Sequence, residues 1–137
     1  MGARHPSARV GAEMLIDSDI LIDAARKDAK AVGFLDTAIR TTNAEISVVS
    51  HMELVVGCRN RRELEALDKF MARFTVVALT LGISRQAVEL LRKYRISHGL
   101  LIPDALIAAT AMLESVPLAT RNLRDFAFID GLELAEY

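Results

Sequence analysis

The sequence is poor in the residues that staple very small folds or break regular structure. Its 137 residues include one cysteine, three prolines, seven glycines and no tryptophan. The single cysteine, Cys58, excludes an internal disulfide and a thiolate metal cage, which fits a reducing cytoplasm. Few chain breakers, together with 52% hydrophobic and 26% charged residues, exclude intrinsic disorder. The composition predicts one folded domain.

An excess of one charge sign and long hydrophobic runs are also missing. Lys and Arg number 17 against 18 Asp and Glu, so the formal net charge of -1 excludes the basic field of a protein that coats nucleic acid. Charges interrupt each apolar stretch before the roughly 20 residues that cross a bilayer. We therefore expect a soluble protein without membrane contact, whose contacts with nucleic acid are local.

The first thirteen residues are small and polar and lack the apolar stretch of a secretory signal. We interpret residues 1–13 as a flexible leader or a cloning remnant and expect a mildly acidic folded domain at 14–137.

Short apolar runs alternate with helical periodicity along this domain. We predict strands at 14–17, 43–49, 75–79 and 118–120, with a poorly defined fifth strand after Asp125. We predict helices at 20–25, 31–39, 50–58, 61–74 and 84–94, and one that Pro103 opens. Strands that alternate with helices form parallel sheets through right-handed crossovers, so the pattern predicts an α/β fold.

Four acidic residues stand where such a sheet would bring them together, because sites in open parallel sheets form beyond the carboxyl ends of the strands. They are Asp17, Glu53, Asp104 and Asp125. Carboxylate oxygens without cysteine or histidine partners are the ligands that Mg²⁺ or Mn²⁺ prefers, and the three histidines are too scattered to indicate zinc. The chemistry that follows is metal-assisted hydrolysis of a phosphodiester.

Each acid also has a purely structural interpretation. Glu53 would close a capping box with Ser50, and Asp104 would complement a helix dipole. Asp125 would cap a short segment together with Asn122, and Asp17 would be a turn residue. A charge at the end of a buried apolar run is costly without a cation, so this alternative explains Asp17 least well.

Four segments resemble, in order, the signature blocks of PIN-domain ribonucleases, and the VapC toxins of bacterial toxin–antitoxin pairs are the most similar kind. They are DSDILID at 17–23, SHMELVVG at 50–57, PDALIAATA at 103–111 and TRNLRDF at 120–126. The resemblance implies a PIN-like domain at 14–137, with a three-layer α/β/α fold and a parallel sheet of about five strands.

The same resemblance implies a Mg²⁺-dependent endoribonuclease, with Mn²⁺ as a substitute, that acts as the toxin of a type II toxin–antitoxin pair. The four acids would then form the catalytic metal site, with Asp17 and Asp104 as its firmest ligands. The resemblance also implies homodimers, and a cognate antitoxin that inhibits the site, often by presenting a basic side chain to it.

Five further residues lie in or beside these blocks. Thr120 and Asn122 match polar positions next to the metal site. Asp19 stands where the family often has Asn or another small polar residue, so its role is open and it adds negative charge. Arg121 and Arg124 are the candidates for contacts with RNA phosphates.

Two alternatives remain open from the sequence. The segment from Asp17 to Asp19 also resembles the Asp-x-Asp opening of haloacid-dehalogenase-like phosphatases, in which Asp17 would be the nucleophile. Such an enzyme needs a downstream lysine, and the chain has none after Lys93. A non-catalytic PIN-like module that only binds a partner is the second alternative. The sequence leaves the RNA target open among transfer, ribosomal and messenger RNA.

Overall fold

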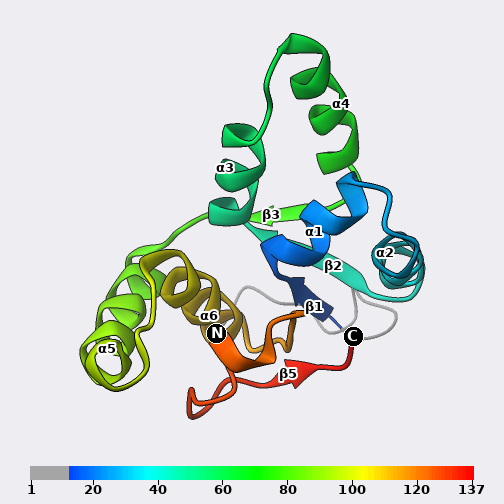
Figure 1. Cartoon of the computed structure of the whole chain (residues 1–137). Helices are drawn as coiled ribbons and strands as arrows, with labels where there is room; N and C mark the ends of the chain where they lie inside the picture. Colours follow the sequence, from blue (N-terminus) through cyan, green and yellow to red (C-terminus); the bar gives the residue numbers. More distant parts are fainter. Residues whose placement is uncertain (1–12) are drawn as a thin grey trace.

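The computed structural model describes residues 13–137, which form three layers around a five-stranded parallel sheet (Figure 1). The strand order is β3-β2-β1-β4-β5, so β1 occupies the centre. The strands are β1 Glu13–Ile16, β2 Asn43–Ser47, β3 Thr75–Val77, β4 Leu118–Ala119 and β5 Leu134–Ala135. The predicted α/β/α fold with about five parallel strands is confirmed. Of the predicted leader, residues 1–12 lie outside the described residues, and Glu13 begins β1.

Six α-helices and a 3-10 helix connect and cover these strands. They are α1 Ser18–Ala25, α2 Ala29–Thr41, α3 Val48–Val56, α4 Arg61–Met71, α5 Leu81–His98, α6 Ile102–Glu114 and the 3-10 helix η2 Leu123–Asp125. In Figure 1, α5 and α6 lie together beside the sheet, whereas α3 and α4 project from it as a helical hairpin. No helix within residues 13–137 has the length and apolar character to span a bilayer.

Two hydrophobic clusters hold the helical layers on opposite faces of the sheet. Neighbouring residues of β1 divide between them, because successive side chains of a strand point to opposite faces: Leu15 packs with α5 and α6, and Ile16 packs with α1 and α2. The alanines of α6 are fully buried, which allows this helix to lie close to the sheet. The core therefore fixes β1 and β4 side by side, with the residues that follow them at one edge.

The start of α3 differs from the prediction. Val48 and Val49 are β-branched and were assigned to a strand, but the strand ends at Ser47 and these two valines begin the helix. The cause is a cap: Ser47 Oγ accepts a hydrogen bond of 3.0 Å from the backbone N–H of Val49. The predicted capping box of Ser50 and Glu53 is therefore wrong, because both residues lie inside α3.

Caps also make α5 longer than the predicted 84–94. Thr80 Oγ1 accepts from the backbone N–H of Ile83 at 3.1 Å, so the helix begins three residues earlier than its apolar pattern. It ends at Gly99, whose left-handed backbone (φ 71°) is the conformation that glycine adopts without strain. The loop after Gly99 leads into α6, which brings Asp104, in the first turn of that helix, to the edge where β1 and β4 end.

Candidate active site

The central element of the site is the pair formed by Asp17 and Thr120. Strand register pairs Ile16 with Ala119, so the next residue of each chain segment leaves the sheet beside the other. The Thr120 hydroxyl donates to Asp17 Oδ2 at 2.8 Å, and the backbone N–H of Ser18 donates to Asp17 Oδ1 at 2.8 Å. Because the exposed fraction is only 5% for Asp17 and 2% for Thr120, the carboxylate is held rigidly at the bottom of the site.

This position makes the ionised form of Asp17 unfavourable. The pKa of Asp17 is raised to about 8, chiefly by burial and then by the charge of Asp19 and a side-chain hydrogen bond with Asp19, while the bonds from Thr120 and Ser18 offset part of the shift. Without a cation, the charge of Asp17 therefore opposes folding at neutral pH.

Glu53 reaches the same region from α3 through a serine pair that the sequence analysis did not identify. Ser18 Oγ lies 2.6 Å from Glu53 Oε1 and 2.8 Å from Ser50 Oγ. A hydroxyl has one proton and a carboxylate only accepts, so when Ser18 donates to Glu53 it accepts from Ser50. The only sequence signal for Ser18 was its place between two aspartates. The network ties α1 to α3 and turns an exposed glutamate toward the site.

Asp104 is half-buried and close enough to the other acids to interact with them. The pKa of Asp104 is raised to about 6, chiefly by burial and then by the charges of Asp125, Glu53 and Asp19, in that order. A helix dipole acting alone would stabilise the charged form and lower the pKa, so the dipole interpretation of Asp104 is insufficient. The charges of Glu53 and Asp125 therefore reach Asp104, and Asp19, which acts on both Asp17 and Asp104, links this group to Asp17.

The loop after β4 does not have the predicted cap. Asn122 precedes η2, but its side chain makes no capping hydrogen bond to this helix. Its Nδ2 instead donates to Asp19 Oδ2, while its backbone N–H donates to Thr120 Oγ1 at 3.0 Å. Asp125 lies in η2 with an exposed side chain. Asn122 thus links the site loop to α1 rather than capping its own helix.

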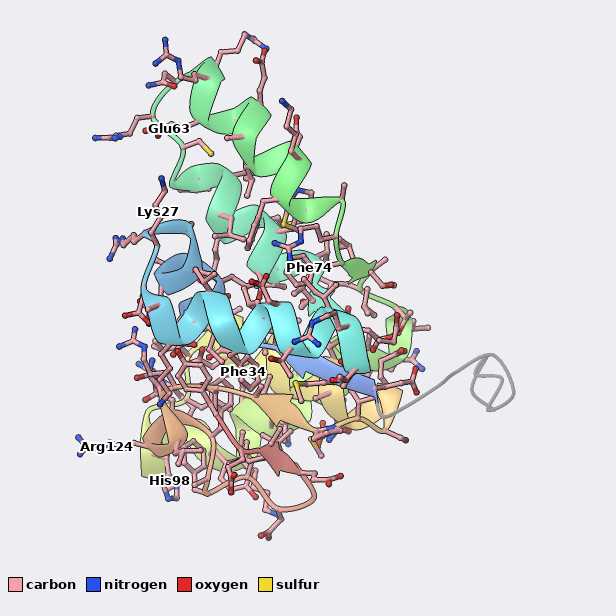
Figure 2. The ribbon with its side chains drawn as sticks, turned by 90° about the vertical axis from the view of Figure 1, so that its right-hand side faces the viewer. Lys27, Phe34, Glu63, Phe74, His98 and Arg124 are labelled. Atoms are coloured by element: carbon pink, nitrogen blue, oxygen red, sulfur yellow. The ribbon has the colours of Figure 1, made fainter. Side chains whose placement is uncertain are left out.

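The two arginines of this loop differ in their surroundings. Arg121 Nε lies 3.0 Å from Asp23 Oδ2 and 4.0 Å from Asp19 Oδ2, so acids of α1 already neutralise its charge. The sequence analysis gave Asp23 no role. Arg124 is exposed, and among the described residues it has no ion pair. Figure 2 shows Arg124 pointing outward on the same side of the molecule as Lys27.

The donor set suits a hydrated hard cation better than zinc. Within residues 13–137, no group of three or more histidine, cysteine or acidic side chains forms a ready-made metal centre. Mg²⁺ does not need one, because it keeps several waters and is held by one or two carboxylates. The clustered groups are all carboxylates, which are the oxygen ligands that such a cation prefers.

Comparison with known proteins identifies the family of the chain. The PIN domain model matches residues 14–132. Ribonuclease VapC10 of Mycobacterium tuberculosis is 37% identical over 121 residues, which cover 88% of this chain and 90% of that protein. A toxin-antitoxin complex from Klebsiella pneumoniae contains a chain with 30% identity and a TM-score of 0.75, covering 88% of this chain and 95% of that one. VapBC2 from Rickettsia felis, at 24% identity, 90% and 98% coverage and a TM-score of 0.77, shares the fold. The chain therefore belongs to the PIN-domain family.

Proposed function

We propose that this protein is a metal-dependent endoribonuclease that acts in the cytoplasm as the toxin of a type II toxin–antitoxin pair. The observation that supports the proposal is a cluster of carboxylates in which the charges of Asp125 and Glu53 act on Asp104, and Asp19 links this group to Asp17. The similarity to a VapC ribonuclease over 88% of the chain supports RNA as the substrate.

The same four acids would hold Mg²⁺, or Mn²⁺ in its place, with Asp17 and Asp104 as the firmest ligands. A bound divalent ion supplies positive charge that polarises the attacking water and offsets the charge that develops on the phosphate. The raised pKa values of Asp17 and Asp104 support this assignment, because clustered and buried carboxylates gain most from a cation.

The other residues of the site position these acids and the substrate. Thr120 orients Asp17 through its bond to Oδ2, and Ser18 orients Glu53 through its bond to Oε1. Arg124 would bind an RNA phosphate, since it is exposed and none of the ion pairs in the described part of the chain involves it. Arg121 would contribute less to RNA binding, because Asp23 already neutralises it.

The partner that we propose is a cognate antitoxin protein. The Klebsiella pneumoniae structure is a toxin-antitoxin complex, and one of its chains matches 88% of this one. An acidic site of this kind would attract a basic side chain from such a partner, which would block access to the metal. Formation of a homodimer remains a prediction.

The two alternatives receive less support. A phosphatase that uses Asp17 as a nucleophile would not require Glu53, which Ser18 holds in the site at 2.6 Å. A PIN-like module that only binds a partner would not require an acidic cluster in which the charges of Asp125 and Glu53 add to the effect of burial on the pKa of Asp104. The phosphatase is also disfavoured by the family match over residues 14–132.

The test is cleavage of a panel of single-stranded and structured RNAs by the full chain freed of co-purified antitoxin. Reactions contain Mg²⁺, Mn²⁺ or EDTA and compare the unmodified protein with Asp104→Asn. Asp68→Asn on exposed α4 is the matched control. We expect metal-dependent cutting that Asp104→Asn abolishes and Asp68→Asn retains.

Retained cutting in Asp104→Asn or in EDTA would overturn the proposed carboxylate–metal mechanism. Failure of the folded, partner-free protein to cut any RNA in the panel would favour the binding module.

A further inference from the structure

The tip of the α3–α4 hairpin carries a group of cations that the acidic site does not use. The loop between the two helices and the first turn of α4 contain Arg59, Arg61 and Arg62, and all three side chains are exposed. The formal net charge of the whole chain is only -1, so contacts with a polyanion have to come from local groups of cations such as this one.

Side chains of the tip hold its backbone in place. Asn60 Oδ1 accepts a hydrogen bond of 2.9 Å from the backbone N–H of Glu63 and so caps α4. Glu63 in turn accepts from the backbone N–H of Arg59 at 2.8 Å and from its guanidinium at 2.7 Å. Glu63 is therefore already engaged, and Arg61 and Arg62 have no ion pair among the described residues.

A purely structural role explains Arg61 and Arg62 poorly. They occupy the first two positions of α4, where the positive end of the helix dipole makes a cation unfavourable. Glu65, four residues after Arg61, is spaced for an ion pair within the helix but forms none in the described part of the chain. Uncompensated cations at a position that costs stability are better explained by an external anion than by the fold.

The tip lies on the same side of the molecule as two further exposed cations. Figure 2 shows Glu63 of the tip on the side where Lys27 and Arg124 also lie. Lys27 has no ion pair among residues 13–137. Arg124 precedes Asp125, whose charge acts on Asp104 of the acidic site. Cations on this side are therefore found both beside the acidic site and at the tip, as a phosphate chain that leaves the site would require.

We propose that Arg61 and Arg62 bind the phosphate backbone of the RNA substrate away from the cleavage site, and so favour RNAs long enough to reach both. This inference rests on the proposed function, because the RNA is the same. Helix α3 carries Glu53 at the site and ends at Val56, before the tip, so a single helix connects the two places. A guanidinium matches a phosphate through two parallel hydrogen bonds, and such contacts position an RNA without reading its sequence.

The experiment measures binding of a fluorescently labelled polyuridine RNA to the full chain, freed of antitoxin, over a series of salt concentrations. All samples contain Mg²⁺ and carry Asp104→Asn, so that the RNA is not cut. One double variant combines Arg61→Gln with Arg62→Gln. The matched control combines Arg85→Gln with Arg92→Gln, which removes the same charge from exposed positions of α5, on the opposite face of the sheet from α4.

We expect the tip variant to bind polyuridine roughly tenfold or more weakly at about 0.1 M salt, and the α5 variant to bind as the Asp104→Asn protein does. The slope of log affinity against log salt should fall by about 1.4 in the tip variant, because each lost contact with a single-stranded phosphate removes about 0.7. Without Asp104→Asn, the tip variant should show a raised KM and an unchanged kcat for any RNA that the protein cuts, since the tip does not touch the reacting phosphate.

Equal RNA affinity and equal salt slope in the two double variants would overturn the inference and leave the tip as a solvated surface. A tip variant that loses affinity for polyglutamate but not for polyuridine would also overturn it and would assign the tip to an acidic protein. Cleavage by the protein without Asp104→Asn separates these failures from that of the proposed function. Metal-dependent cutting alongside either result rejects only the inference, whereas no binding and no cutting of any RNA reject both.

Discussion

The two sides of the acidic site differ in burial more than in residue type. On the sheet side, Asp17 is 5% exposed, and its pKa is raised to about 8, chiefly by burial. On the rim, Glu53 and Asp125 are exposed acids carried by α3 and η2. Half-buried Asp104 lies between these extremes, with a pKa of about 6. The difference indicates that ionisation is most unfavourable on the sheet side, where a bound cation would stabilise the charged carboxylate, whereas the exposed rim leaves room for substrate.

Replacement of the buried acid should give the largest effect. We expect Asp17→Asn to reduce RNA cleavage on the order of 10²-fold or more, the loss typical of removing one electrostatic group from a reaction centre. Its melting temperature without metal should rise, because a neutral amide is cheaper to bury than a charge. Cleavage rates and thermal unfolding of the same sample measure both. A lower melting temperature would contradict the idea that Asp17 opposes folding.

The pH dependence of stability should come next. The folded-state pKa values of Asp17 and Asp104 lie above their ordinary value of 3.8, so between about pH 4 and pH 8 the folded state binds more protons than the unfolded state. Stability without metal therefore falls as pH rises through this window, by an order of a few kcal/mol. Urea unfolding from pH 4 to 9 measures the slope.

Asp17→Asn is the control for the pH experiment, and it should remove most of the dependence above pH 6. Millimolar Mg²⁺ should flatten the curve of the unmodified protein by stabilising the ionised site. A stability that increases steadily from pH 5 to 8 without metal would count against the raised pKa values.

Loss of the hydroxyl at Thr120 should have an intermediate effect. Thr120→Val keeps the shape of the side chain but removes the 2.8 Å bond to Asp17 Oδ2. We expect a loss of about 1–3 kcal/mol in the free energy of unfolding, measured with the site ionised, and a further rise in the pKa of Asp17. Denaturant unfolding at pH 9 measures the first. Thr120→Ser retains the donor and is the control; equal losses in both variants would assign the effect to packing.

A change at the rim should have the smallest effect on stability. Glu53→Gln should alter the free energy of unfolding by no more than about 0.5 kcal/mol, because residue 53 is exposed and the amide oxygen of the glutamine can still accept a hydrogen bond from Ser18. Cleavage should fall by less than in Asp17→Asn. A stability change as large as that of Thr120→Val would show that the rim is as tightly coupled to the fold as the sheet side.

The hydrophobic periodicity of the sequence was sufficient to predict the architecture. It did not predict helix ends that depend on capping hydrogen bonds. The alternation of apolar runs and helical stripes indicated the parallel sheet, and the small residues of α6 indicated its close packing. The predicted strand that ran on to Val49 was wrong, because β propensity is weaker than the cap that Ser47 provides. The start of α3 thus depends on the hydroxyl of Ser47, which a hydrophobic pattern does not take into account.

The acids could be proposed from the sequence because Asp17 follows β1 and the other three lie in helical segments that the alternating pattern indicated. Although the resemblance indicated Asn122, the contacts that support the acids were not predictable, since Ser18, Asp23 and Asn122 act through side chains of distant segments. Asn122 and Asp19, for example, are 103 residues apart and meet only because β4 pairs with β1. A linear pattern contains the spacing of motifs but not the direction in which each side chain points.

The central position of β1 in the sheet also determines when the site can form during synthesis of the chain. Asp17 is synthesised early, but Thr120, its hydrogen-bond partner, follows 103 residues later and reaches it only when β4 docks against β1. Until β4 has been synthesised, the edge of β1 that pairs with β4 is unpaired. Strands with an unpaired edge tend to associate with other chains. The acidic centre can form only after residues 118–125 have been synthesised, and most of the chain is therefore made before the centre exists.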